Sequence, residues 1–202
     1  MEKYLKVTEI IDWKNPQILE LSSKISSKYQ TKEAITKACF EWVRDKIKHS
    51  SEYKLNPVTY KASDVLKYKT GFCFAKSHLL AALLRANNIP TGFCYQRLSI
   101  DDKGALYSLH GLNAVYLNKW GWYRIDPRGN NQVVNAQFIP PQEKLAYPIN
   151  LPEERDVVPE EKDFKKIFSE PLEIIINALK SFKTWDKLIQ NLPDVENITR
   201  LL

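Results

Sequence analysis

The sequence predicts an α+β fold in which N-terminal helices pack on an antiparallel β-sheet and a helical extension ends the chain. The prediction rests on the order of three patterns. Apolar residues recur at helical spacing as far as Asn87, alternating segments follow as far as Asp126, and helical spacing returns after Asp163. The 202 residues, 44% hydrophobic and 27% charged, have the composition of an ordinary globular protein.

Helix signals are clear in the first part of the chain. Asn15 precedes Pro16, which is the usual order of a capping residue and a first helical residue. Thr31 can cap a longer helix, because apolar residues then recur at positions i, i+3, i+4 and i+7 through Ile47. Residues 49–62 are predicted to form a loop. Helices are therefore expected to begin at Pro16, after Thr31, at Ser63 and at about Cys73, the last of them running to Asn87.

Alternating polarity then predicts a β-meander. The expected strands are Thr91–Ile100, Ala105–Leu117 and Trp120–Asp126. Residues 127–162 contain six prolines and few periodic apolar positions, which predicts an ordered surface strap without regular secondary structure. A helical pattern is expected from Asp163 to Leu179, and a last helix should contain Trp185 and Leu192.

Composition and charge argue against several classes of protein. The chain carries 30 Lys and Arg against 24 Asp and Glu, but its basic residues are scattered among acidic ones, which disfavours nucleic acid as a partner. No run approaches about 18 apolar residues, so we expect no membrane span and no signal peptide. The three cysteines lack the spacing of a disulfide framework or a zinc site. We therefore expect a cytoplasmic protein with no metal and no cofactor.

Cys73 lies where the backbone can assist a nucleophile. It closely follows Gly71 and begins a strongly apolar predicted helix. The N-terminus of a helix presents unpaired N–H groups and a partial positive charge, which favour the reactive thiolate and can bind an oxyanion. The alternative is that Cys73 is a small buried hydrophobic residue.

His110 and Asp126 are predicted to meet across a hairpin. If its turn is centred on Asn118, the two residues are directly opposite, with Cβ atoms about 4.5–5.5 Å apart. The carboxylate would then fix the tautomer of the imidazole and stabilise the imidazolium. The alternatives are a structural His–Asp hydrogen bond or no contact at all, because a register slip of one residue would put the two on opposite faces.

Three blocks of sequence resemble those of transglutaminase-like proteins. The blocks are Gly71–Ala75 with its continuation to Pro90, His110–Leu117 and Gly121–Pro127. The resemblance covers about residues 35–130 and implies a papain-like α+β core with a triad of Cys73, His110 and Asp126. We accordingly assign residues 1–162 to a catalytic domain, with its core at 31–130. Residues 163–202 are assigned to a C-terminal helical extension packed on the same domain.

The chain departs from the family pattern at two positions near the triad. Leu112 stands where many relatives carry an aromatic residue, and Phe74 stands where animal transglutaminases have Trp. We also expect these 202 residues to leave no room for the additional β-domains of those enzymes. These differences argue against protein cross-linking more than against the triad.

Other residues are weaker candidates for the site. His78 should face away from Cys73, because five residues turn a helix by about 140°. His49 follows a predicted core helix and could approach the cleft, but we expect it at the surface. Cys39 and Cys94 are expected to pack in the core. Trp122 and Arg124 share a strand face with Asp126 and could line the site, but we expect a core Trp122 and a solvated Arg124. A second oxyanion donor could come from Tyr53 or Tyr60, between which the sequence does not decide.

The expected function is cysteine-dependent acyl transfer from an amide bond of a protein or peptide. Cys73 would attack the carbonyl, His110 would act as base and then as acid, and Asp126 would orient His110. Water as acceptor makes a protease or amidase, and an amine makes a transglutaminase, so the triad does not decide between them. The alternative is a non-catalytic protein- or peptide-binding module that keeps the fold.

Overall fold

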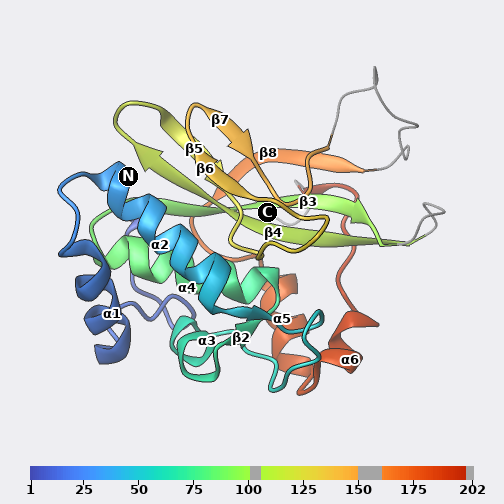
Figure 1. Cartoon of the computed structure of the whole chain (residues 1–202). Helices are drawn as coiled ribbons and strands as arrows, with labels where there is room; N and C mark the ends of the chain where they lie inside the picture. The colour runs from blue at the N-terminus through green and yellow to red at the C-terminus, as the bar shows by residue number, and fades with distance from the viewer. Residues whose placement is uncertain (101–105, 150–160, 199–202) are drawn as a thin grey trace.

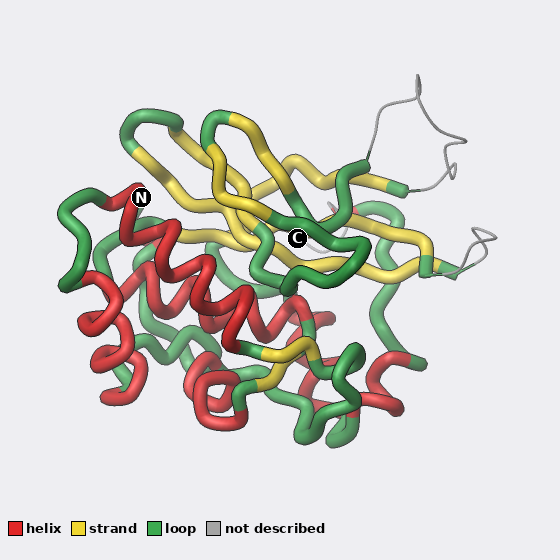
Figure 2. The backbone as a smooth tube through the Cα atoms, viewed as in Figure 1, coloured by secondary structure: helices red, strands yellow, loops and turns green. Residues whose placement is uncertain are grey.

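The computed structural model describes residues 1–100, 106–149 and 161–198, and these form a helical layer packed on a β-sheet (Figures 1 and 2). The predicted α+β architecture is therefore confirmed. The N-terminal helices are η1 (Glu2–Tyr4), α1 (Pro16–Ser26), α2 (Lys32–Lys46), α3 (Ala62–Tyr68) and α4 (Cys73–Ala86).

The predicted helix caps are present. The Asn15 side chain accepts a hydrogen bond from the Gln17 backbone at the start of α1 (3.0 Å), and Thr31 accepts one from Ala34 at the start of α2 (3.2 Å). The helix at the centre of the layer is α4, which contacts α1, α2, α3 and the sheet. Every residue of α4 except Ala86 is buried, so this helix is the scaffold on which the other elements pack.

The main sheet is antiparallel and has the strand order β5-β4-β3-β8. Its strands are β5 (Gly121–Ile125), β4 (Tyr107–Leu117), β3 (Thr91–Ser99) and β8 (Lys162–Phe168). One face packs on α4 and contributes to the main hydrophobic core. The other face carries a small second cluster made by Cys94, Leu112, Ala114 and Leu145.

The described part of the chain also contains two small sheets. The first pairs β1 (Lys48–His49) in parallel with β2 (Thr70–Gly71), and the second is a hairpin of β6 (Gln137–Ile139) and β7 (Gln142–Lys144). The loop predicted for residues 49–62 thus begins with a strand residue, His49. The strap predicted for residues 127–162 contains the β6–β7 hairpin. The sequence did not predict these strands, because the prolines of this region disfavour strands, although Pro140 and Pro141 lie at the turn of the hairpin.

The prediction of helix from Asp163 to Phe168 was wrong, because these residues belong to strand β8. Phe164 and Phe168 pack on the main core, whereas Ile167 packs on the second cluster across the sheet. Apolar residues on both faces of a strand imitated a helical i, i+3, i+4 pattern. The division of the chain at residue 162 stays a prediction.

The β4–β5 hairpin also differs from its predicted register. In the observed register, Val115 pairs with Tyr123, so the centre of the turn lies one residue after the predicted centre, Asn118. Continued past the end of β5, this register places Asp126 opposite Leu112, two residues from His110. Because side chains alternate with a period of two, a shift of two residues leaves His110 and Asp126 on the same face of the sheet.

The C-terminal part contains the helices α5 (Glu173–Ser181) and α6 (Trp185–Ile189), which confirm the predicted helical extension. The last helix is shorter than predicted, because α6 ends before Leu192. Figure 1 shows both helices beside the helical layer and the chain after α6 rising toward the level of the sheet. Its buried residues Leu188, Val195 and Ile198 belong to the main core, so this segment packs on the rest of the molecule along its length.

Candidate functional site

Cys73 is the first residue of α4, as predicted. Phe72 occupies the N-cap position and provides no side-chain cap, so the N–H groups of the first turn remain available to a ligand. Gly71 does not have the left-handed backbone conformation that glycine favours. A Cβ there would lie 3.1 Å from the Ala75 Cβ and 3.3 Å from the Thr59 hydroxyl, so close packing explains the glycine.

The sheet brings His110 to the start of α4. The neighbour of His110 on β4 is Gly111, where an added Cβ would lie only 2.5 Å from a ring carbon of Phe74. The Ser77 hydroxyl donates a hydrogen bond to the Gly111 carbonyl (3.3 Å). The absence of a side chain at Gly111 thus lets β4 approach α4 closely enough for His110 to reach Cys73.

Asp126 holds the imidazole from the other side, and the predicted hydrogen bond is present. His110 Nε2 donates to Asp126 Oδ2 at 2.7 Å. The Ala146 backbone N–H donates to the same oxygen (3.1 Å), and the Arg128 N–H donates to Oδ1 (3.1 Å). Asp126 is fully buried, so these three donors take the place of water around its carboxylate.

The ionisation of the pair follows from this arrangement. Burial lowers the pKa of His110, but the charge of Asp126, the charge of Cys73 and hydrogen bonds to both raise it to about 10. Burial raises the pKa of Asp126, but the charge and hydrogen bond of His110 and the two backbone donors bring it below its usual value. With Nε2 bonded to Asp126, the ring nitrogen Nδ1 is the one available to the Cys73 sulfur.

A segment that the sequence did not mark as functional covers the pair. Residues 145–148 follow the β6–β7 hairpin and return to the site. The ring of Tyr147 meets that of His110 edge-on with centroids 5.0 Å apart, and the Tyr147 carbonyl accepts a hydrogen bond from the Gln96 amide (3.1 Å). Since Ala146 also binds Asp126, the return of this segment shields the His–Asp hydrogen bond from solvent.

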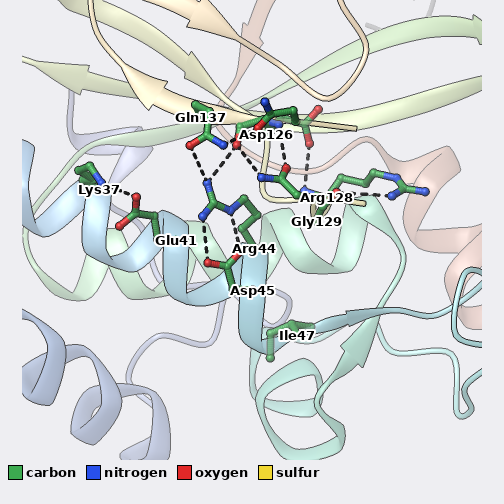
Figure 3. A network of polar contacts seen from close by, with 12 residues as sticks. Lys37, Glu41, Arg44, Asp45, Ile47, Asp126, Arg128, Gly129 and Gln137 are labelled. Atoms are coloured by element: carbon green, nitrogen blue, oxygen red, sulfur yellow. Dashed lines mark hydrogen bonds and ion pairs between the residues drawn. The ribbon is translucent and has the colours of Figure 1, made fainter. Parts of the chain in front are cut away.

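A polar network fixes the chain that follows Asp126 (Figure 3). Arg44, near the end of α2, forms an ion pair with Asp45 and donates to the Ala136 carbonyl (3.0 Å) and the Gln137 side chain (3.2 Å). The buried ammonium of Lys76 donates to the carbonyls of Arg44 and Ile47 at the end of the same helix. The network thereby fastens α2, α4 and the loop after β5 to one another.

A cleft of about 550 Å³ is lined by Cys73 and His110. His49 also lines this cleft, which contradicts the surface position expected for it. It stands on β1 opposite Gly71, its ring meets the Phe72 ring edge-on, and its Nδ1 lies 3.1 Å from the Ser51 hydroxyl. Its position depends on β1–β2 pairing between distant residues, for which the sequence carries no strong pattern.

The remaining candidates lie away from the cleft. Tyr53 is half exposed, and the Tyr60 ring lies beneath the ammonium groups of Lys61 and Lys180, so neither lines it. His78 faces away as predicted, with its Nδ1 2.7 Å from the Tyr60 carbonyl.

Cys39 and Cys94 are buried in the two hydrophobic clusters, as expected. Trp122 packs against the rings of Tyr4 and Tyr116. The expectation of a solvated Arg124 was wrong, because this side chain is largely buried in ion pairs with Glu143 and Asp163.

Comparison with known proteins defines the family. The family model described as the transglutaminase-like superfamily matches residues 19–127, which is more than half of the chain and includes Cys73, His110 and Asp126. The chain belongs to the transglutaminase-like superfamily. The match ends before the β6–β7 hairpin, β8 and the C-terminal helices, so these parts of this transglutaminase-like protein lie outside it.

A solved structure shares the fold, and a second is similar over part of its length. A candidate cysteine protease from Cytophaga hutchinsonii has 19% sequence identity and a TM-score of 0.50, over 62% of this chain and 40% of that one. The periplasmic domain of TgpA from Pseudomonas aeruginosa has 19% identity and a TM-score of 0.48, over 61% and 46%. The chain thus matches less than half the length of these structures. None of the curated protein sequences matches the chain.

Within the described ranges, no three His, Cys, Asp or Glu side chains gather as the ligands of a metal ion would. No helix in that part of the chain is long and apolar enough to cross a membrane.

The geometry predicts that Cys73 is the most reactive of the three thiols. It lines the cleft, whereas burial raises the pKa of both Cys39 and Cys94 to about 12. Iodoacetamide labelling of the folded protein at pH 7, mapped by mass spectrometry, should modify Cys73 at least about tenfold faster than either of the others. Faster labelling of Cys39 or Cys94 in the native protein would refute this assignment.

Proposed function

We propose that the protein is a cysteine-dependent acyl-transfer enzyme that acts on amide bonds. The observation that carries the proposal is the meeting of Cys73, at an uncapped helix N-terminus, with a buried His110 that Asp126 holds by a 2.7 Å hydrogen bond. Membership of the transglutaminase-like superfamily supports the same chemistry. The cleft beside these residues gives a carbonyl compound access to the sulfur.

In the first half of the reaction, the Cys73 thiolate attacks the carbonyl carbon of the amide and forms a carbon–sulfur bond. The carbonyl oxygen becomes an oxyanion next to the N–H groups at the start of α4. When the carbon–nitrogen bond breaks, the imidazolium of His110 gives its Nδ1 proton to the departing amine. A thioester on Cys73 and a neutral His110 remain.

In the second half, neutral His110 removes a proton from the acceptor as it attacks the thioester. The carbon–sulfur bond breaks, Cys73 leaves as thiolate, and His110 is again an imidazolium. Water as acceptor gives a carboxylic acid, and an amine gives a new amide. Asp126 keeps its negative charge throughout and holds the imidazole in the productive orientation.

His49 is the residue we assign as the second donor to the oxyanion, in place of Tyr53 or Tyr60. Burial and the positive charges of Arg128, Lys76 and His110 hold the pKa of His49 well below its usual value, so the ring is neutral at pH 7. When the Ser51 hydroxyl donates to Nδ1, the ring proton is on Nε2. A neutral N–H donor beside Cys73 can stabilise an oxyanion without competing with His110 for protons.

Substitution of Asp126 tests the triad. Asp126→Asn should preserve the fold but lower kcat by about 10²- to 10⁴-fold, because the amide can hold the wrong tautomer of His110. Cys73→Ala should abolish turnover. Asp163→Asn is the matched control, because this carboxylate is also partly buried and ion-paired but lies outside the cleft, and its turnover should be unchanged.

Mass spectrometry of the wild-type protein incubated with glutaminyl and peptide amides should detect the thioester on Cys73, and the products identify the acceptor. A folded wild-type protein that forms no adduct and consumes no amide across a broad library would instead establish a binding module.

Substitution of His49 tests the oxyanion donor. His49→Ala should lower kcat by about 10²- to 10³-fold with little change in KM, because the donor acts on charge that develops in the transition state. Alkylation of Cys73 by iodoacetamide forms no oxyanion, so its rate should stay within about twofold of wild type. His49→Gln, which retains an N–H donor, should recover part of the activity. Equal losses in acylation and alkylation would show that His49 only supports the local structure.

A further inference from the structure

The segment 183–198 forms one side of the cleft through Ile189 and Leu192. It lies wholly outside residues 19–127, the part of the chain that defines the family. The cleft of this protein is therefore partly built by residues that the shared core does not provide.

One end of the segment is tied to the helical layer. The Val58 backbone N–H donates to the Lys183 carbonyl (3.1 Å), and the Trp185 N–H donates to the side chain of Asn56 (2.8 Å). The buried side chain of Leu188 anchors α6 between these contacts and the cleft. These bonds fix the position from which Ile189 reaches the cleft.

The other end is tied to the strand that carries His110. The Leu109 backbone N–H donates to the Pro193 carbonyl (2.8 Å), and the guanidinium of Arg97 holds both carboxylate oxygens of Asp194 at 2.6 Å. Such a bidentate pair has a fixed geometry, and the Arg97 side chain is buried. Leu192 lies next to this anchor, so its place in the cleft is also fixed.

The cleft lining near this segment is apolar. Leu98, Ile100 and Leu109 of the sheet region line the same cleft as Ile189 and Leu192. Ile100 and Ile189 are 53% and 37% exposed, so apolar surface faces the solvent at a place where a ligand can cover it.

Polar residues line the cleft as well, among them Ser99 on β3 and Ser108 on β4. His49 and Ser51 belong to β1 and the loop after it, and Arg128 follows β5 and is paired with Glu52. Glu161 also lines the cleft, and its carboxylate accepts a hydrogen bond from the Ser99 backbone (3.0 Å). Both charged groups thus have partners within the protein.

We propose that the segment 183–198 recognises an aliphatic side chain of the acyl donor, and that Ile189 and Leu192 determine this specificity. The proposal rests on the proposed function only in taking the ligand to be a peptide amide. Differences of one methylene group in an apolar site change kcat/KM by about 10- to 200-fold, so a leucine side chain should be preferred strongly over a charged one.

The test uses three peptide amides that differ only in one residue next to the reacting carbonyl, which is Leu, Lys or Glu. For the wild-type protein, kcat/KM should favour Leu over both others by at least about tenfold. Ile189→Lys should reduce the preference for Leu over Glu by at least about tenfold, because it replaces apolar surface with a positive charge. Leu19→Lys is the matched control, since Leu19 is similarly exposed on α1 but does not line the cleft, and its preferences should equal those of wild type.

Two results of this comparison would overturn the proposal. One is a wild-type preference for the Lys or the Glu peptide. It would show that Glu161 recognises a positive side chain, or that Arg128 recognises a negative one. The other is an equal loss for all three peptides in Ile189→Lys, which would show a structural role only.

Binding to Cys73→Ala separates this inference from the proposed function. The Leu peptide should bind this variant at least about tenfold more tightly than the Glu peptide, and Ile189→Lys in the same background should remove the difference. Selective binding without turnover by wild type would refute the enzyme and retain the recognition site. Turnover by wild type without selective binding or selective kcat/KM would refute the recognition site and retain the enzyme.

Discussion

The site depends on one buried hydrogen bond, that between His110 and Asp126. A carboxylate without contact to water is costly unless other donors surround it, and here the imidazole and two backbone N–H groups do so. Those backbone donors belong to Arg128 and Ala146, on either side of the β6–β7 hairpin. The hairpin and the network around Arg44 can therefore be understood as the structure that keeps this carboxylate charged and in place.

The same hydrogen bond has a chemical consequence, because it sets the charge of His110. Asp126 and Cys73 together outweigh the effect of burial and raise the pKa of the imidazole to about 10. Because the pKa of His110 is higher in the folded protein than in the unfolded chain, protonation of the imidazole stabilises the fold. This stabilisation is fully present below pH 6.5, the ordinary pKa of histidine, and is lost as the pH rises through about 10. His49, which lines the same cleft, is held neutral by burial and by its positive neighbours, so two histidines can serve as acid and as neutral donor.

Local patterns predicted much of this arrangement. The caps at Asn15 and Thr31, the helix that begins at Cys73 and the shared face of His110 and Asp126 all follow from rules that act within a few residues. The predicted pairing of the β4–β5 hairpin was wrong by two residues. The prediction that His110 and Asp126 share one face of the sheet was still right, because only a shift by an odd number of residues moves a side chain to the opposite face. Tertiary pairing explains what was missed, since His49 and Tyr147 reach the site through contacts with distant segments, and β8 is a strand because it pairs with β3.

The most direct test of this account is an NMR titration of the His110 ring in the folded wild-type protein, with Asp126→Asn for comparison. The account predicts that His110 stays protonated through neutral pH and titrates near pH 10. In Asp126→Asn the pKa of His110 should fall, because the larger of the two charges that oppose the effect of burial is gone. A wild-type His110 that titrates near 6.5, or a pKa that does not change in the variant, would contradict the claim that Asp126 sets the charge of the imidazole.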